Sequence, residues 1–124
     1  MKWTNEQNEA IIHENNENIL VSAGAGSGKT AVLSERILEK VKSGVKLDSL
    51  LVLTFTEAAA YEMKSRIKEK ILEEPSTSHL ANEVDGAYIT TFDSYALSIV
   101  KKYHYLLGID KNISVIDGSI IKLL

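Results

Sequence analysis

Short apolar runs separated by stretches of helical spacing dominate the hydrophobic pattern of this chain. The runs at residues 19–21, 49–55 and 87–90 are compact and mostly apolar, which predicts buried strands. After each run, apolar residues recur every three or four positions, which predicts a helix. Strands that alternate with helices in this way favour an α/β fold with a parallel sheet flanked by helices.

Polar and glycine residues mark where the expected helices begin. Thr4 and Gln7 have the spacing of a capping box, so a short first helix should open there. A second helix should begin at about Gly28, directly after a glycine-rich segment. Asp93 and Ser94 are both residue types that can cap the helix after the last predicted strand.

The expected ends of these helices are also marked. The second helix should stop near residues 43–44, a serine and a glycine. The next should end by Pro75, with residues 76–79 forming a loop. Further along, residues 113–116 predict a short strand, and residues 117–119 should open a final helix.

The glycine-rich segment lies between the first predicted strand and the second predicted helix, and it has the composition of a phosphate-binding loop. Glycines let the backbone approach phosphates closely, while a helix N-terminus and a flexible ammonium supply positive charge. Lys29 would reach the β- and γ-phosphates, and the Thr30 hydroxyl would join Mg²⁺. The residues expected to hold the phosphates are Ala23, Gly24, Ala25, Gly26, Ser27, Gly28, Lys29 and Thr30.

This segment follows the pattern G-x-x-x-x-G-K-[ST] except at its first position, where Ala23 stands. A glycine-rich turn followed by a chance Lys-Thr pair is the simpler explanation. The strand before the segment and the helix after it favour ATP or GTP binding instead, with Lys29 as the catalytic residue. We expect no metal other than the Mg²⁺ that accompanies the nucleotide.

Three further segments resemble motifs of the UvrD/Rep-type superfamily I DNA helicases. Residues 3–10, which read WTNEQNEA, resemble the Q motif, and residues 51–63 resemble motif Ia. Residues 90–95, TTFDSY, resemble the next DNA-side motif, which is usually T-x-H-S-F. Together with the phosphate loop they occur in family order. The resemblance covers essentially the whole chain and implies that residues 1–124 are an incomplete, amino-terminal part of a RecA-like P-loop NTPase domain.

Within that family, the resemblance is strongest to helicase–nuclease subunits, through residues 3–4, 28–33 and 102–107. It implies ATP-driven translocation along single-stranded DNA with strand separation, in DNA repair or recombination. It also implies ATP and Mg²⁺ as cofactors and a possible second helicase–nuclease subunit as partner. By the same resemblance, Gln7 would hydrogen-bond the adenine.

The matching residues give this chain a set of expected DNA contacts. Hydroxyls that follow parallel strands lie at the sheet edge where α/β proteins bind ligands, and they can hold DNA phosphates. Phe55 can stack on a base, although a phenylalanine at the end of an apolar strand is more often part of a core. The expected DNA-binding residues are Thr54, Phe55, Thr56, Thr91 and Ser94.

At two positions this chain departs from the family pattern on the DNA side. Glu57 stands where the family often has asparagine, and it could repel a phosphate or stabilise the start of a helix. Asp93 replaces the usual histidine, which exchanges a potential donor for an acceptor.

Length, composition and charge limit the domain count, the cellular compartment and the way this chain could contact DNA. The chain has 124 residues, no cysteine and a net charge of −3, which fits one small domain or part of a larger one in a reducing cytoplasm. The sequence shows neither a signal peptide nor a transmembrane segment. With this charge, DNA contacts must come from a local patch. A partly basic run is interrupted by glutamates and fits a solvated helix surface; its cations are Lys64, Arg66, Lys68 and Lys70.

Hydrolysis of ATP needs a carboxylate pair for Mg²⁺ and usually an arginine, and the sequence shows neither. We therefore expect the isolated chain to bind nucleotide weakly and not to unwind DNA. A nucleotide-responsive module without hydrolytic residues is the alternative. Another P-loop phosphotransferase is disfavoured, because the two DNA-side resemblances would then be accidental.

Overall fold

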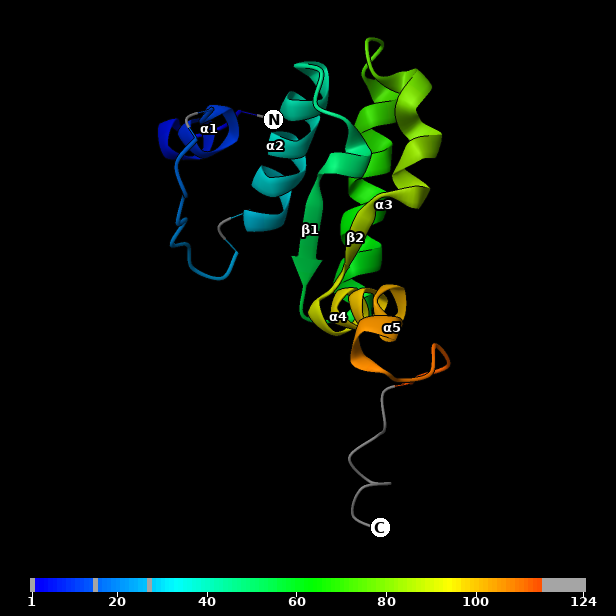
Figure 1. The fold of residues 1–124 in the computed structure, drawn as a ribbon. Coiled ribbons are helices and arrows are strands. Elements are labelled where there is room, and N and C mark those ends of the chain that lie inside the picture. Colours follow the sequence, from blue (N-terminus) through cyan, green and yellow to red (C-terminus); the bar gives the residue numbers. More distant parts are fainter. Residues whose placement is uncertain (1, 15, 27, 115–124) are drawn as a thin grey trace.

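The computed structural model describes residues 2–14, 16–26 and 28–114, and it has mixed α/β structure (Figure 1). Among these residues, no helix is long and apolar enough to cross a membrane. The predicted helix at residues 117–119, and residues 115–116 of the strand before it, lie outside the described residues. The elements in chain order are α1 (Asn5–Ile12), α2 (Lys29–Lys42), the 3₁₀ helix η1 (Leu47–Ser49), β1 (Leu51–Thr54), α3 (Glu57–Glu73), the 3₁₀ helix η2 (Ser78–Gly86), β2 (Tyr88–Thr91), α4 (Phe92–Lys102) and α5 (His104–Leu107).

The two strands form a parallel pair, as the sequence predicted. Val52 lies opposite Ile89, and Thr54 at the end of β1 lies opposite Thr91 at the end of β2. Parallel strands need a long crossover, which α3 and η2 provide. Since β2 runs straight into α4 and β1 leads into α3, both helices begin at the same edge of the sheet (Figure 1).

The hydrophobic core lies between the strands, α2, α3 and η2. Its most deeply buried side chains are Ile67, Ile71 and Val84, which are at most 1% exposed. These residues join the crossover helix to η2, and Val52 and Ile89 add one face of the sheet. The rest of this core comes from Ile37, Leu38, Val41, Leu47, Met63 and Ala81.

The bounds of α2 and α3 agree with the sequence prediction. Gly28 is the N-cap of α2, and its last residue is Lys42. Beyond it, Val45 N–H donates to the Lys40 carbonyl and Gly44 N–H donates to the Val41 carbonyl, at 3.0 Å each. This pair of bonds is a Schellman motif, in which Gly44 adopts a φ of +99°.

The strand predicted at residues 19–21 is absent. Residues 18–24 form neither helix nor strand, and Leu20 is 95% exposed while Val21 is 56% exposed. An apolar run becomes a buried parallel strand only when a neighbouring strand accepts its hydrogen bonds and helices cover its faces. In the part of the chain that the structure describes, β1 and β2 pair with each other and leave this segment without a strand partner.

Three local predictions are also corrected. The cap of α4 is Thr91, whose hydroxyl accepts from Ser94 N–H at 3.1 Å, so neither Asp93 nor Ser94 caps the helix. The expected loop at residues 76–79 gives way to η2 from Ser78 onward. Residues 113–114, expected to begin a strand, are not in one.

The Schellman glycine gives a stability test. Gly44→Ala should lower the free energy of unfolding by about 1 kcal/mol, because alanine is sterically disfavoured at positive φ although no atom lies within 4 Å of the added Cβ. Urea unfolding followed by circular dichroism measures the change. Gly86→Ala is the matched control, since Gly86 has no positive φ and equal open space. Equal effects of the two substitutions would contradict the role given to the backbone angle.

Candidate nucleotide site and strand-end surface

The predicted phosphate loop ends on the first turn of α2. Gly26 and Gly28 have φ angles of +75° and +79°, a conformation that glycine adopts without strain, whereas Gly24 has no positive φ. Lys29 and Thr30 are the first two residues of the helix, and no side chain of the described residues caps its N-terminus. The backbone N–H groups of this turn therefore carry the partial positive charge of a helix start, which attracts anions. Ser27 lies outside the described residues.

Gln7, the expected adenine contact, lies beside this loop. It takes part in the predicted capping box: Gln7 N–H donates to Thr4 Oγ1 at 3.2 Å, and Thr4 N–H donates to Gln7 Oε1 at 2.9 Å. The second bond fixes the plane of the carboxamide. A Cβ placed on Gly28 would lie 3.5 Å from Gln7 Nε2, so the structure brings the Q-motif residue and the phosphate loop together.

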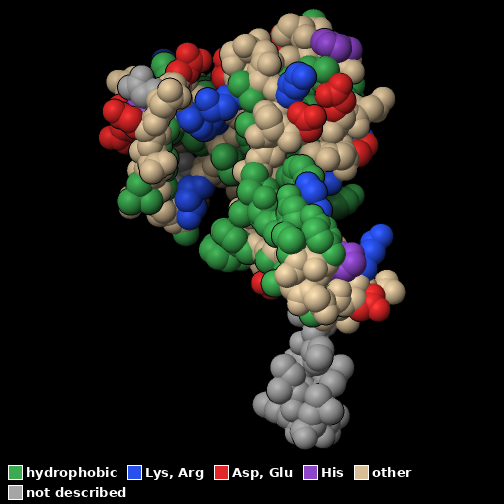
Figure 2. All heavy atoms as spheres, viewed as in Figure 1, with side chains coloured by type: hydrophobic (Ala, Val, Ile, Leu, Met, Phe, Trp, Pro, Cys, Tyr) green, Lys and Arg blue, Asp and Glu red, His purple; other side chains and the backbone are tan. Residues whose placement is uncertain are grey.

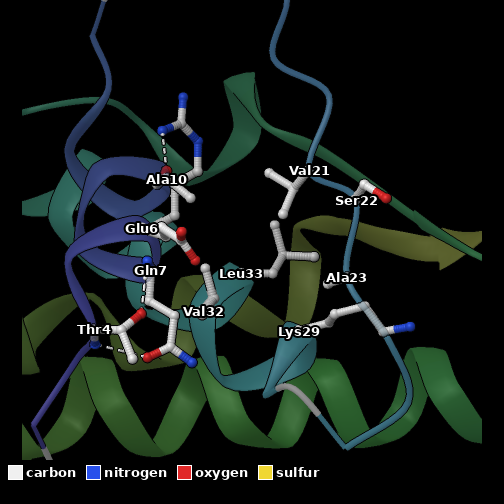
Figure 3. A pocket seen from close by; sticks show the side chains of 11 residues that line it. Thr4, Glu6, Gln7, Ala10, Val21, Ser22, Ala23, Lys29, Val32 and Leu33 are labelled. Atoms are coloured by element: carbon white, nitrogen blue, oxygen red, sulfur yellow. Dashed lines mark hydrogen bonds between the residues drawn. The ribbon is translucent and has the colours of Figure 1, made fainter.

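A cavity of about 570 Å³ lies between α1, residues 21–23 and the first half of α2. Figure 3 shows Val21 and Leu33 facing each other across it, with Gln7 and Lys29 on opposite sides of its lower part. In the space-filling view, the same region is a hollow between the α1 lobe and the rest of the molecule (Figure 2). The volume is within the range of small-molecule sites, and the mostly apolar wall with a few polar groups is typical of them.

The hydroxyls predicted to bind DNA lie together at the carboxyl ends of the strands, and each makes bonds within the protein. Thr54 Oγ1 donates to the Thr56 carbonyl at 3.1 Å. Thr56 Oγ1 accepts from Ala59 N–H at 3.1 Å and so caps α3, as Thr91 caps α4. Two of these threonines therefore set the starts of the helices, a role that the sequence analysis gave to neither Thr56 nor Thr91.

Glu57 connects the two helix starts. Its Oε1 accepts from Ser94 Oγ at 2.9 Å and from Thr91 Oγ1 at 3.4 Å. Glu57 is the first residue of α3, where a negative charge is favoured by the helix dipole. The position of Glu57 agrees with the helix-stabilising role considered for this carboxylate. Its bonds also occupy two of the hydroxyls expected to hold phosphate, those of Thr91 and Ser94.

Phe55 forms an exposed aromatic pair with Phe92. Phe55 is 90% exposed, so the alternative explanation, that it is part of a core, does not hold among the described residues. Its ring centroid lies 5.4 Å from that of Phe92, with an angle of 29° between the planes. Phe92, itself 50% exposed, was not among the predicted site residues. Its position directly after β2, equivalent to that of Phe55 directly after β1, is the signal that could have identified it.

The basic side chains of α3 form ion pairs and a hydrogen bond with other residues of this chain. Lys70 Nζ lies 2.6 Å from Glu35 Oε2, and Lys68 Nζ lies 2.7 Å from Asp85 Oδ2. Arg66 pairs with Glu62 at 2.9 Å, and Lys64 donates to the Asp85 carbonyl at 3.3 Å. These contacts agree with a solvated helix surface. Among the described residues, no cluster of three His, Cys, Asp or Glu side chains could hold a metal ion.

Comparison with known proteins decides between the families that use a phosphate loop. The model of the UvrD/REP helicase N-terminal domain matches residues 3–122. The chain belongs to this family. The resemblance inferred from the four motifs is thereby confirmed, and the mixed α/β structure with its parallel strand pair is consistent with a UvrD/REP helicase N-terminal domain.

Curated relatives of this UvrD/REP-family chain are named as subunits of an ATP-dependent helicase/nuclease. The protein from Lactobacillus johnsonii is 47% identical over 125 residues, which cover 95% of this chain and 10% of the relative. The protein from Geobacillus thermodenitrificans is 45% identical over 133 residues, or 99% of this chain and 11% of the relative. The predicted likeness to helicase–nuclease subunits is confirmed, and the chain spans about a tenth of the length of these relatives.

Removal of the Glu57 carboxylate should loosen the link between α3 and α4. We expect Glu57→Ala to lower the free energy of unfolding by about 1 kcal/mol, because two hydroxyls lose their acceptor and α3 loses a favourable N-terminal charge. Urea unfolding measures the change. Glu62→Ala, which removes an exposed pair with Arg66 on the same helix, should cost only about 0.3–0.5 kcal/mol. A smaller loss for Glu57→Ala than for the control would argue against the link.

Proposed function

We propose that this chain forms the ATP-binding part, and one single-stranded DNA contact surface, of an ATP-dependent DNA helicase that acts in DNA repair or recombination. One observation carries the proposal. Lys29 and Thr30 open α2 directly after Gly28, which has a positive φ as Gly26 does, and Gln7 lies against the same loop beside an open cavity. In this proposal the loop would hold the phosphates and Gln7 would contact the base.

The residues of this site fit ATP with Mg²⁺. Lys29 would neutralise the β- and γ-phosphates, and the Thr30 hydroxyl would bind the metal ion. Gly24 and Gly26 leave open space where a Cβ would point, so phosphates can approach the backbone. Gln7 would donate from Nε2 to the base while its Oε1 stays held by Thr4. Bound ATP would supply the free energy for movement along DNA.

The strand-end surface is the group of side chains at the carboxyl ends of β1 and β2, namely Thr54, Phe55, Thr56, Thr91, Phe92 and Ser94. Its exposed aromatic rings fit single-stranded DNA. Phe55 and Phe92 present stacked, exposed rings beside the starts of α3 and α4. Bases stack on such rings without regard to sequence. Four hydroxyls line the same edge, those of Thr54, Thr56, Thr91 and Ser94. They would contact the phosphates of the DNA backbone once some of their hydrogen bonds within the protein rearrange.

Translocation, strand separation and assembly with a second helicase–nuclease subunit would be properties of the whole protein. The curated relatives are about ten times as long as this chain, and their printed name joins helicase with nuclease. For residues 1–124 alone we propose nucleotide and DNA binding without unwinding. Strong DNA-stimulated ATPase activity from residues 1–124 alone would contradict the proposal that they bind nucleotide and DNA without doing the work of the whole protein.

Lys29→Ala should abolish stabilisation of the chain by ATP and Mg²⁺. For the unmodified chain, ATP at 100 times its Kd should add about 2.7 kcal/mol to the free energy of unfolding. The variant loses the ammonium that faces the phosphates, so its thermal midpoint should not respond to ATP. Lys46→Ala, a change at an exposed lysine outside the cavity, should leave the response intact. Unchanged ATP affinity in Lys29→Ala would rule out this loop as the phosphate site.

Phe55→Ala should weaken binding of single-stranded DNA. Loss of one stacking surface costs about 1–3 kcal/mol of binding free energy, or roughly fivefold to more than a hundredfold in Kd. Fluorescence anisotropy with a labelled oligonucleotide measures the change, and thermal stability should stay nearly constant because Phe55 is 90% exposed. Tyr61→Ala removes a 76% exposed aromatic ring from α3 and serves as the control. Equal affinity of both variants would contradict stacking at Phe55.

A further inference from the structure

Arg36 makes a contact that neither the family motifs nor the proposed phosphate chemistry explains. It lies in α2, two turns after Lys29, and its guanidinium reaches back to α1. Arg36 Nη1 donates to the Ala10 carbonyl at 2.7 Å and lies 3.5 Å from the Ile11 carbonyl. The dashed line at Ala10 in Figure 3 marks the shorter bond.

These two carbonyls belong to the last turn of α1, where a helix leaves its acceptors without intrahelical partners. Within the described part of the chain, the capping bond from the backbone goes to the Glu9 carbonyl, donated by His13 N–H at 3.1 Å. A helix C-terminus carries partial negative charge, so a guanidinium there both satisfies acceptors and neutralises the dipole. Arg36 thus supplies the positive charge that α1 itself lacks, since no basic residue stands in its last turn.

The attachment of α1 otherwise rests on its packing against α2. The helix has eight residues, too few to be stable alone in water, and Ile11 is its one buried side chain. α1 packs mainly on α2, and the described residues of the loop that follows it are mostly exposed. The Arg36 bonds therefore tie the C-terminal turn of α1 directly to α2.

The placement of α1 decides where Gln7 lies. Gln7 occupies the third position of α1, and Thr4 holds its Oε1, so the carboxamide moves with the helix as one body. Gln7 Nε2 lies close to Gly28 at the start of α2. Any sliding of α1 along α2 would change the distance between the base contact and the phosphate loop.

We infer that Arg36 is a positioning residue for base recognition, which fixes the spacing between Gln7 and the phosphate loop through the C-terminus of α1. This inference rests on the proposed nucleotide function and adds to it a residue that lines the same cavity but acts through its bonds to α1. Loss of the guanidinium would impair binding of the adenosine end of ATP while leaving the triphosphate end unchanged.

The test compares ATP with inorganic triphosphate, both with Mg²⁺, by isothermal titration calorimetry on the 124-residue chain. Arg36→Met keeps a long apolar stem and removes the donors. ATP affinity should fall about tenfold, which corresponds to about 1.4 kcal/mol. The affinity for triphosphate should stay constant. Arg36→Lys retains a donor and a charge and should recover part of the ATP affinity. Arg66→Met, on the exposed side of α3, is the matched control and should change neither affinity.

Two further measurements separate positioning from a general loss of structure. Trp3, the only tryptophan, lies just before α1 beside residues of α2 and α3, so a red shift of its fluorescence reports displacement of this end of the chain. In a Gln7→Ala background, Arg36→Met should no longer change the ratio of ATP to triphosphate affinity. Circular dichroism at 222 nm shows whether the remaining helices stay folded.

The outcomes are distinguishable. A parallel fall of both affinities, or no fall in either, would overturn the role of Arg36 while phosphate binding stands. If the unmodified chain binds triphosphate as tightly as ATP, Gln7 does not contact the base. That result would also overturn the role of Arg36. Binding of neither ligand by the unmodified chain would instead defeat the proposed function itself.

Discussion

Parallel pairing of β1 with β2 is the constraint on which the rest of this structure depends. Two parallel strands cannot be joined by a tight turn, so the chain must cross over through α3 and η2. Burial of Ile67, Ile71 and Val84 holds that crossover in place. Because the strands point the same way, α3 and α4 start side by side, and only this topology brings Glu57 to Ser94 and Phe55 to Phe92.

Local sequence signals predicted the elements whose boundaries depend on local chemistry. Gly28 and Gly44 bound α2 because each adopts a positive φ that glycine tolerates best. Pro75 ends α3 for an equally local reason. The capping box at Thr4 and Gln7 belongs to the same class, since both of its bonds lie within four residues.

The failures concern features that depend on distant partners or on a one-residue choice of backbone angle. Residues 19–21 have the composition of a strand, but composition does not supply a neighbour to pair with. Several nearby polar residues are of types that can cap α4. Thr91 is the cap because its backbone has the extended angles of an N-cap residue, φ −82° and ψ 160°. Phe55 was ambiguous for a related reason: its exposure follows from the turn geometry after β1, which hydrophobicity alone does not reveal.

The hydrogen bonds already made at the strand-end surface bear on how it would bind DNA. The strand-end surface is fixed by the core, and its hydroxyls are satisfied by helix caps and by the Glu57 carboxylate. A phosphate must compete there with an anion already in place, whereas a base meets no such competition at the exposed rings of Phe55 and Phe92. Stacking releases few counterions, so binding dominated by these rings would depend on salt less than binding through phosphate contacts. For a chain of net charge −3, aromatic contact is thus the energetically easier way to hold DNA at this edge.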